Sequence, residues 1–143
     1  MKVRDLSAVN ALMGACVLAK MASAEKAKFL KARKEIKKAV ADYDDLCKDA
    51  AEKLKPEGFD ELYEKVQTHS AMTAEEVAAY YRAVKQYNEE TEAATKEDGD
   101  ADVELSYDRL TEDGFLQLVD SNDKLTVDQI ERLEEALCAS ESK

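Results

Sequence analysis

Apolar residues recur along this chain mainly at steps of three and four, which is the period of an amphipathic helix. The clearest repeat lies in Ala24–Leu54. Its positions alternate at four-then-three spacing, interrupted by Arg33, in the order Phe29, Arg33, Ile36, Val40, Tyr43, Cys47, Ala50 and Leu54. This coiled-coil-like seam predicts one long helix that packs along a neighbour, because helix propensity alone supplies too little stability. The neighbour is either another part of the same chain or a second chain.

Shorter amphipathic stretches lie on both sides of this helix. Ser7–Met21 combines an apolar repeat with small Ala and Gly residues on its other faces, which favours a buried helix. Pro56 ends the long helix because proline lacks an amide donor, and a short amphipathic segment follows it. Thr73 opens a capping box, with Glu76 three residues on, and predicts a helix over Thr73–Ala94.

The C-terminal third contains two further caps and one stretch with a different period. Thr111 precedes a short helix that runs through Val119, and Thr126 with Gln129 forms a second capping box before the last helix. Between these caps and the preceding helix, Val103–Tyr107 alternates apolar and polar residues, which is the period of an extended segment.

Together these elements predict a mostly α protein. We expect a helical bundle around one long helix at about Ala24–Leu54, with a short extended segment near Val103–Tyr107. The first helix and Thr73–Ala94 are expected to pack along the seam of the long helix. Residues 1–143 form a single helical domain in this prediction, and residues 95–102 form an acidic connector to the C-terminal elements. The content of four Gly and one Pro agrees with long helices.

Charge is divided unevenly along the chain. Residues 1–38 carry ten Lys/Arg and three Asp/Glu, whereas residues 39–143 carry eleven and twenty-nine, and the whole chain has a net charge of −11. Seven of the ten basic residues in residues 1–38 lie on the long helix. Neutralisation of these basic residues by acidic helices, in the same or another subunit, explains their clustering better than direct nucleic-acid binding. Nucleic-acid binding normally adds a net positive domain and stacking aromatic residues. The acidic remainder either keeps the protein soluble or imitates a phosphate backbone.

Residue types that carry chemistry are few. Asp120–Glu131 resembles a calcium-binding loop at four ligand positions, but Lys124 and Leu125 stand where an oxygen ligand and a glycine are needed, so we expect an acidic turn. His69 is the single histidine, and no catalytic partner is fixed near it. The odd number of widely spaced cysteines (Cys16, Cys47 and Cys138) indicates reduced thiols in the cytoplasm. We therefore predict no enzyme, no cofactor and no metal site.

The order of elements in two stretches resembles small proteins of unknown function encoded in tailed-phage and prophage genomes. The stretches are Val9–Leu54 and Tyr87–Leu137, and the second includes the sequence DADVELSYDRLTEDGFLQLV. The resemblance covers about two thirds of the chain and is one of element types. It implies a phage origin and a non-enzymatic role as a virion accessory, an assembly factor or a host-directed inhibitor, and it carries over no functional residues.

These observations predict an interaction protein that acts through its apolar seam and polarised charge. Its partner is another protein or a second copy of the chain, and we expect no membrane contact and a location in the cytoplasm of a bacterial host or in a virion. The residues predicted to carry the interaction lie on the long helix: Phe29, Lys31, Lys34, Ile36, Lys37, Lys38, Val40 and Tyr43. The alternative is an acidic inhibitor that occupies the basic groove of a nucleic-acid-binding host protein.

Overall fold

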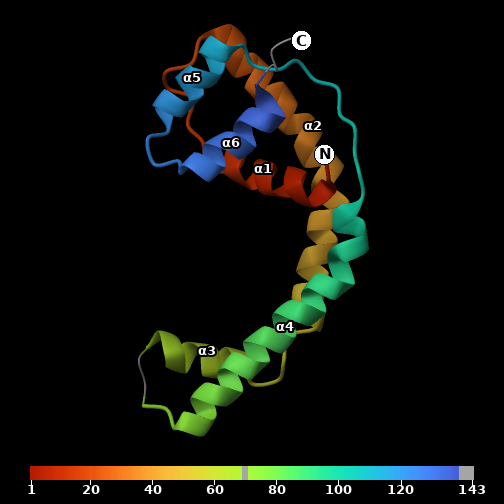
Figure 1. The fold of residues 1–143 in the computed structure, drawn as a ribbon, viewed down its shortest axis with the longest axis vertical. Coiled ribbons are helices and arrows are strands. Elements are labelled where there is room, and N and C mark those ends of the chain that lie inside the picture. Colours follow the sequence, from red (N-terminus) through yellow and green to blue (C-terminus); the bar gives the residue numbers. More distant parts are fainter. Residues whose placement is uncertain (69–70, 139–143) are drawn as a thin grey trace. The chain divides into compact units, whose positions relative to one another are not determined.

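The computed structural model describes residues 1–68 and 71–138, and this part of the chain forms six helices (Figure 1). They are α1 (Val3–Ala15), α2 (Ser23–Lys53), α3 (Phe59–Gln67), α4 (Ala74–Asp100), α5 (Glu112–Ser121) and α6 (Val127–Leu137). The predicted mostly α class is confirmed. The structure has two long helices rather than one, because α4 has 27 residues beside the 31 of α2.

The chain divides into two compact units, where the sequence predicted one domain. Unit 1 comprises Met1–Tyr43 with Gly99–Lys143, and unit 2 comprises Asp44–Asp98. The division falls inside α2 and inside α4, so each long helix contributes residues to both units.

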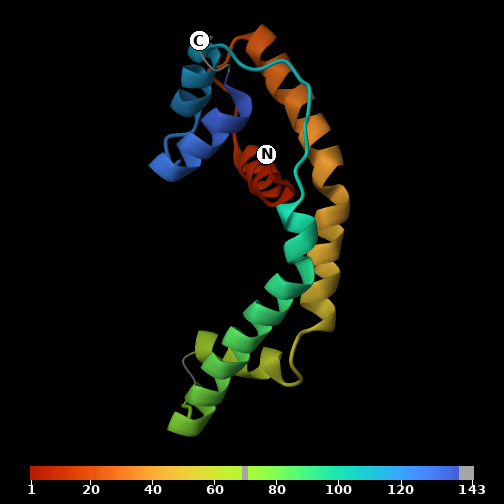
Figure 2. The same cartoon turned by 45° about the vertical axis from the view of Figure 1, so that its right-hand side comes forward.

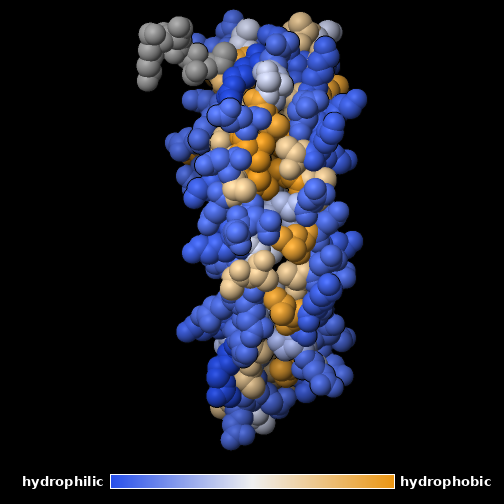
Figure 3. All heavy atoms as spheres, turned by 90° about the vertical axis from the view of Figure 1, so that its right-hand side faces the viewer, coloured by the Kyte–Doolittle hydropathy of each residue, from blue (hydrophilic) through white to orange (hydrophobic). Residues whose placement is uncertain are grey.

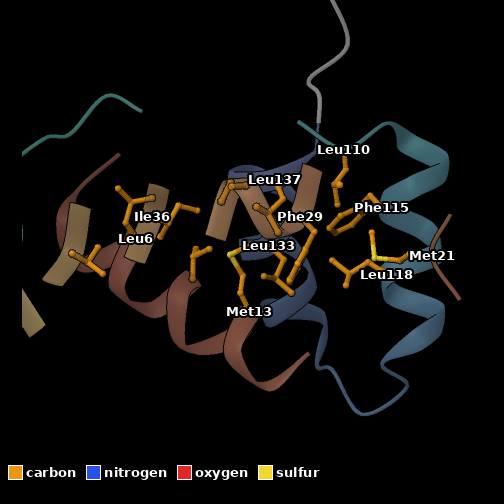
Figure 4. Close-up of a cluster of buried hydrophobic side chains, with 14 of the residues drawn as sticks. Leu6, Met13, Met21, Phe29, Ile36, Leu110, Phe115, Leu118, Leu133 and Leu137 are labelled. Carbon is orange, nitrogen blue, oxygen red and sulfur yellow. The ribbon is translucent and has the colours of Figure 1, made fainter. Parts of the chain in front are cut away.

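Unit 1 encloses an apolar core built by α1, α2, α5 and α6 (Figure 4). α1 packs along α6, and α5 also contacts α6. The largest side chains that are completely buried are Val9, Met13, Ile36, Val40, Leu110, Leu118, Leu133 and Leu137. Burial of each such side chain contributes about 1.5–3 kcal/mol, so this core is the main source of stability in unit 1.

Helix α1 begins and ends earlier than the predicted Ser7–Met21. At its start, Val3 is buried and its amide donates to the Ala101 carbonyl at 2.9 Å. The apolar repeat therefore begins at Val3, three residues before Leu6. After Ala15 the backbone leaves the helix, because side chains of α5 bind the amides of the following loop.

That loop is held by three polar residues of α5 and its C-cap. The Asn122 side chain accepts from the Val17 amide and donates to the Val17 carbonyl, both at 2.8 Å. Further along the loop, backbone amides donate to the side chains of Ser121 and Gln117 at 2.9 Å. These contacts join residues about a hundred positions apart, so the local sequence pattern contains no sign of them.

The first residues of the predicted acidic connector are helical. Residues 95–100 form the last turns of α4, which continues past the predicted end at Ala94. The helix is fixed there by Asp100, which forms ion pairs with Arg4 and Lys2, and by Gly99, which approaches the Tyr43 ring closely. A β-carbon at Gly99 would lie 3.0 Å from the Tyr43 hydroxyl oxygen, so a side chain there would crowd the ring.

Residues 101–110 form the actual connector within unit 1, and they run beside α2 (Figure 2). The predicted extended segment is confirmed as irregular extended chain. Val103, Leu105 and Tyr107 pack against the core, and the residues between them are exposed. Isolated bridges attach the connector to Lys2 at one end and to Cys138 at the other.

Unit 2 contains the C-terminal part of α2, α3 and most of α4. The predicted end of α2 near Pro56 is confirmed, and Gly58 adopts a positive φ of 76° before α3. The predicted capping box of α4 is also confirmed: the Glu76 amide donates to the Thr73 hydroxyl at 3.1 Å, and the Thr73 amide donates to the Glu76 carboxylate at 3.3 Å. Phe59 of α3 stacks on Tyr80 and Tyr87 of α4, which fixes the two helices against each other.

Candidate interaction surfaces

Four lysines form an exposed basic face on α2, hereafter the α2 basic face: Lys31, Lys34, Lys37 and Lys38. Lys31, Lys34 and Lys38 follow steps of three and four, so they lie in one row along the helix. The row is opposite the apolar stripe of α2 that faces the core. The structure thus gathers all four predicted lysines on one solvent-facing surface.

The α2 basic face forms no ion pair within the described part of the chain, although the carboxylates of Glu35 and Asp108 lie beside Lys31 and Lys34. None of its four lysines forms an ion pair with another described residue. Lys28, which belongs to the same basic run, pairs with Glu25 of the same helix at 3.5 Å. The predicted neutralisation by acidic helices of the same subunit is therefore not seen at this face, and the four charges face solvent.

The apolar residues predicted to carry the interaction occupy a different position. Phe29, Ile36 and Val40 are buried in the core of unit 1, with exposed fractions of 2%, 0% and 0%. Tyr43 is half-buried and packs against the same core. The sequence left open whether the seam packs against the same chain or against a second chain. At these positions it packs against the same chain. The apolar half of the predicted interaction site is corrected accordingly: it is core.

Leu30 is an exposed apolar side chain beside the lysines. It is 57% exposed and lies one residue from Lys31 and four from Lys34. A leucine in this position adds an apolar contact area to a surface that is otherwise charged. The α2 basic face therefore combines positive charge with one exposed aliphatic group.

A depression of about 460 Å³ opens beside Lys31 and Lys34. Glu35 also lines it, and its far wall is the connector at residues 106–108. Tyr107 holds that wall in place, because its hydroxyl donates to the Ala136 carbonyl at 2.6 Å. Arg109 lies over the Tyr107 ring at 5.7 Å and donates to the Glu135 carbonyl at 2.8 Å. Burial raises the pKa of the Tyr107 hydroxyl, so it remains a proton donor at neutral pH.

Unit 2 presents a surface of the opposite charge. Residues 44–98 contain fifteen Asp/Glu and seven Lys/Arg, a net charge of −8. Among its described residues only Ala50 and Thr95 are buried. Three of its larger side chains are exposed instead: Tyr63 by 47%, Val77 by 38% and Tyr81 by 64%. Figure 3 shows apolar side chains reaching the molecular surface between hydrophilic ones.

A buried acidic contact near the start of α2 was missed by the sequence analysis. Glu25 is 8% exposed, and its carboxylate accepts from the Thr111 hydroxyl at 2.6 Å. The same hydroxyl accepts from the Gly114 amide at 3.0 Å and so caps α5. This hydrogen bond from Thr111 holds the pKa of the Glu25 carboxyl below its usual value, ahead of the opposing effect of burial. The contact links α2 to α5 and has a structural role.

The remaining candidate chemical groups are the calcium-like segment Asp120–Glu131, the three cysteines and His69. In the calcium-like segment, the Asn122 side chain is occupied by Val17 and by the Leu118 carbonyl. Within residues 1–68 and 71–138, no group of three or more His, Cys, Asp or Glu side chains is placed to hold a metal ion. The three cysteines, all described, form no disulfide. His69 lies outside the described residues.

The fold and its surfaces define a mostly α-helical protein with one basic and one acidic exposed surface. Comparison of the chain with family models, with curated proteins and with solved structures found no match. Among the described helices, none is both long enough and apolar enough to cross a membrane.

Proposed function

We propose that this chain is a non-enzymatic helical interaction protein that binds its partner through exposed charged surfaces. The observation that carries the proposal is the α2 basic face, whose four lysines project from one side of a helix without an ion pair to another described residue. Because Phe29, Ile36 and Val40 serve the core, the binding surface is the charged side of α2 rather than its apolar seam.

The biological setting we propose follows from the resemblance to phage-encoded helical proteins. In that setting the chain is a virion accessory or an assembly factor in the cytoplasm of a bacterial host. A protein of this kind needs defined contact surfaces and no reaction centre. An α-helix whose buried side is fixed by a core presents its other side to a partner with little reorganisation, which lowers the cost of association.

A capture experiment tests this function. The full-length chain and the variant K31E/K34E/K37E/K38E are immobilised and exposed to host lysate at low and high salt, with bound proteins identified by mass spectrometry. We expect specific capture by the unmodified chain and its loss in the variant. The control K48E/K53E/K85E/K96E changes the net charge equally at exposed lysines elsewhere, and it should retain the partner. Equal capture by all three chains, or specific capture by none together with no self-association, would overturn the proposal.

The second candidate function is an acidic inhibitor of a nucleic-acid-binding protein. The net charge of −8 on unit 2 favours it, because rows of carboxylates can occupy a groove that normally binds phosphates. In the same capture experiment this function predicts a basic partner that is displaced by added DNA. Capture would then survive reversal of the four lysines and would be lost on neutralising the acidic residues of α3.

A further inference from the structure

The two exposed surfaces of the chain are complementary in charge and in apolar content. The α2 basic face carries four lysines around the exposed Leu30, and none of them forms an ion pair with another described residue. Unit 2 carries a net charge of −8 and exposes Tyr63, Val77 and Tyr81. Complementary potentials steer two surfaces together, and buried aromatic side chains supply most of the binding energy once they are in contact.

Unit 2 also exposes apolar side chains that contact with another protein surface would remove from water. Its described residues include no large apolar side chain that is buried, although α3 and α4 together contain an aromatic cluster of Phe59, Tyr80 and Tyr87. Val77 and Tyr81 are four residues apart, so they project from the same side of α4, where they are 38% and 64% exposed. Exposed apolar groups bordered by polar residues are typical of sites that bind another protein.

We propose that the occupant of this surface is a second copy of the chain, whose α2 basic face binds the acidic α3–α4 surface of unit 2. The inference rests on the proposed function and names its partner. The described chain itself supplies a surface of the required character: lysines for the carboxylates of α3, and Leu30 for the exposed tyrosines. Glu61 and Glu64 lie on α3 beside Tyr63 in the sequence, whereas Asp60 is already paired with Lys55, so charge and aromatic contact occur on one element.

The contact joins two different surfaces, which determines the form of the assembly. Each chain carries one basic and one acidic surface, and such a heterologous contact extends into a ring or a filament unless two chains bind each other reciprocally. Either outcome gives a particle larger than a monomer. Because the charges are exposed, the affinity must fall when salt shortens the screening length from about 10 Å at 0.1 M toward about 3 Å at 1 M.

Sedimentation velocity with the purified full-length chain tests self-association directly. We expect oligomers at 0.1 M salt, with a dissociation constant that rises at least about tenfold at 0.5 M salt. K31E/K34E/K37E/K38E should be monomeric, since it places four carboxylates opposite an acidic surface. K48E/K53E/K85E/K96E has the same net charge but a more acidic unit 2, and it should associate at least as well as the unmodified chain. Circular dichroism confirms that each variant is folded.

A mixing experiment identifies the two surfaces. Y63S/V77S/Y81S removes the exposed apolar groups of unit 2 and should be monomeric alone, as the lysine variant is. The lysine variant retains the acidic surface and the tyrosine variant retains the basic face, so an equimolar mixture should form a one-to-one complex and nothing larger. A mixture that stays monomeric would overturn the inference, as would an unmodified chain that is monomeric at 0.1 M salt. If such a monomer still captures a host protein through the α2 basic face, the proposed function stands and only the inferred partner is wrong.

Discussion

Replacing Thr111 with alanine removes one hydroxyl that performs two tasks in unit 1. The hydroxyl caps α5 by accepting from the Gly114 amide, and it donates to the buried Glu25 carboxylate at 2.6 Å. Loss of a threonine cap costs about 1 kcal/mol. Loss of a hydrogen bond to a charged group costs about 1.5–3 kcal/mol more, because the buried carboxylate then keeps only the longer contacts with the Thr111 amide at 3.4 Å and the Lys28 ammonium at 3.5 Å. We therefore expect T111A to destabilise the contact between α2 and α5 by about 2.5–4 kcal/mol.

Hydrogen exchange followed by mass spectrometry is the suitable assay, because the two units can unfold separately and a global melting curve would combine them. Protection of the α5 amides should fall roughly a hundredfold or more in T111A, since about 1.4 kcal/mol corresponds to a factor of ten. The control T111S keeps the hydroxyl and should retain most of the protection. In an E25Q background the effect of T111A should shrink toward the cap contribution. Equal effects of T111A in both backgrounds would show that the Glu25 contact contributes nothing.

Three further outcomes follow from the same structure. The pKa of Glu25 is lowered in the folded state, so its contribution to stability is present above its unfolded pKa and is lost as the pH falls through its folded pKa. E25Q should therefore flatten the loss of α5 protection as the pH falls below the ordinary glutamate value of about 4.5. N122A releases the Val17 amide and carbonyl, and thiol labelling of Cys16 should become faster than in the unmodified chain; unchanged labelling would contradict this role. Millimolar calcium should leave the melting temperature unchanged, because Asn122 is occupied and Lys124 stands at a ligand position; a rise would reinstate Asp120–Glu131 as a site.

The parts of the fold that were predictable depend on residues close in sequence. The capping boxes at Thr73 and Thr126 form the hydrogen bonds that their spacing predicts. The end of α2 near Pro56 follows from the missing amide donor of this proline. The seam spacing likewise identified Ile36 and Val40 as residues that need a neighbour. For the two capping boxes, one turn of helix contains all the groups involved, so the sequence alone is sufficient.

The parts that were not predictable depend on contacts between distant residues. Helix α1 ends at Ala15 because Asn122 and its neighbours bind the next loop, and α4 reaches Asp100, where Arg4 forms an ion pair. Glu25 and Thr111 are 86 positions apart. A glutamate in the first turn of a helix is common because its charge is favourable near the helix N-terminus, so Glu25 gave no sign of burial. Only the early start of α1 has a local sign in the sequence, because Val3 lies three residues before Leu6 and extends the apolar repeat.

The uneven distribution of charge along the sequence predicts that α2 carries the interaction surface, but it does not predict which side of α2 is exposed. Periodicity alone could assign the seam either to the core or to a partner, and the burial of Phe29 decides for the core. Once the seam is used internally, the lysines on the other side form no ion pair with another described residue, although Glu35 and Asp108 lie beside Lys31 and Lys34, and unit 2 is left with aromatic residues that no core covers. A 55-residue segment with so little buried apolar surface gains more from association than a fully packed unit would, because covering its tyrosines removes surface that folding has left in water. The division of charge along the chain thus supplies the selectivity of the contact we propose.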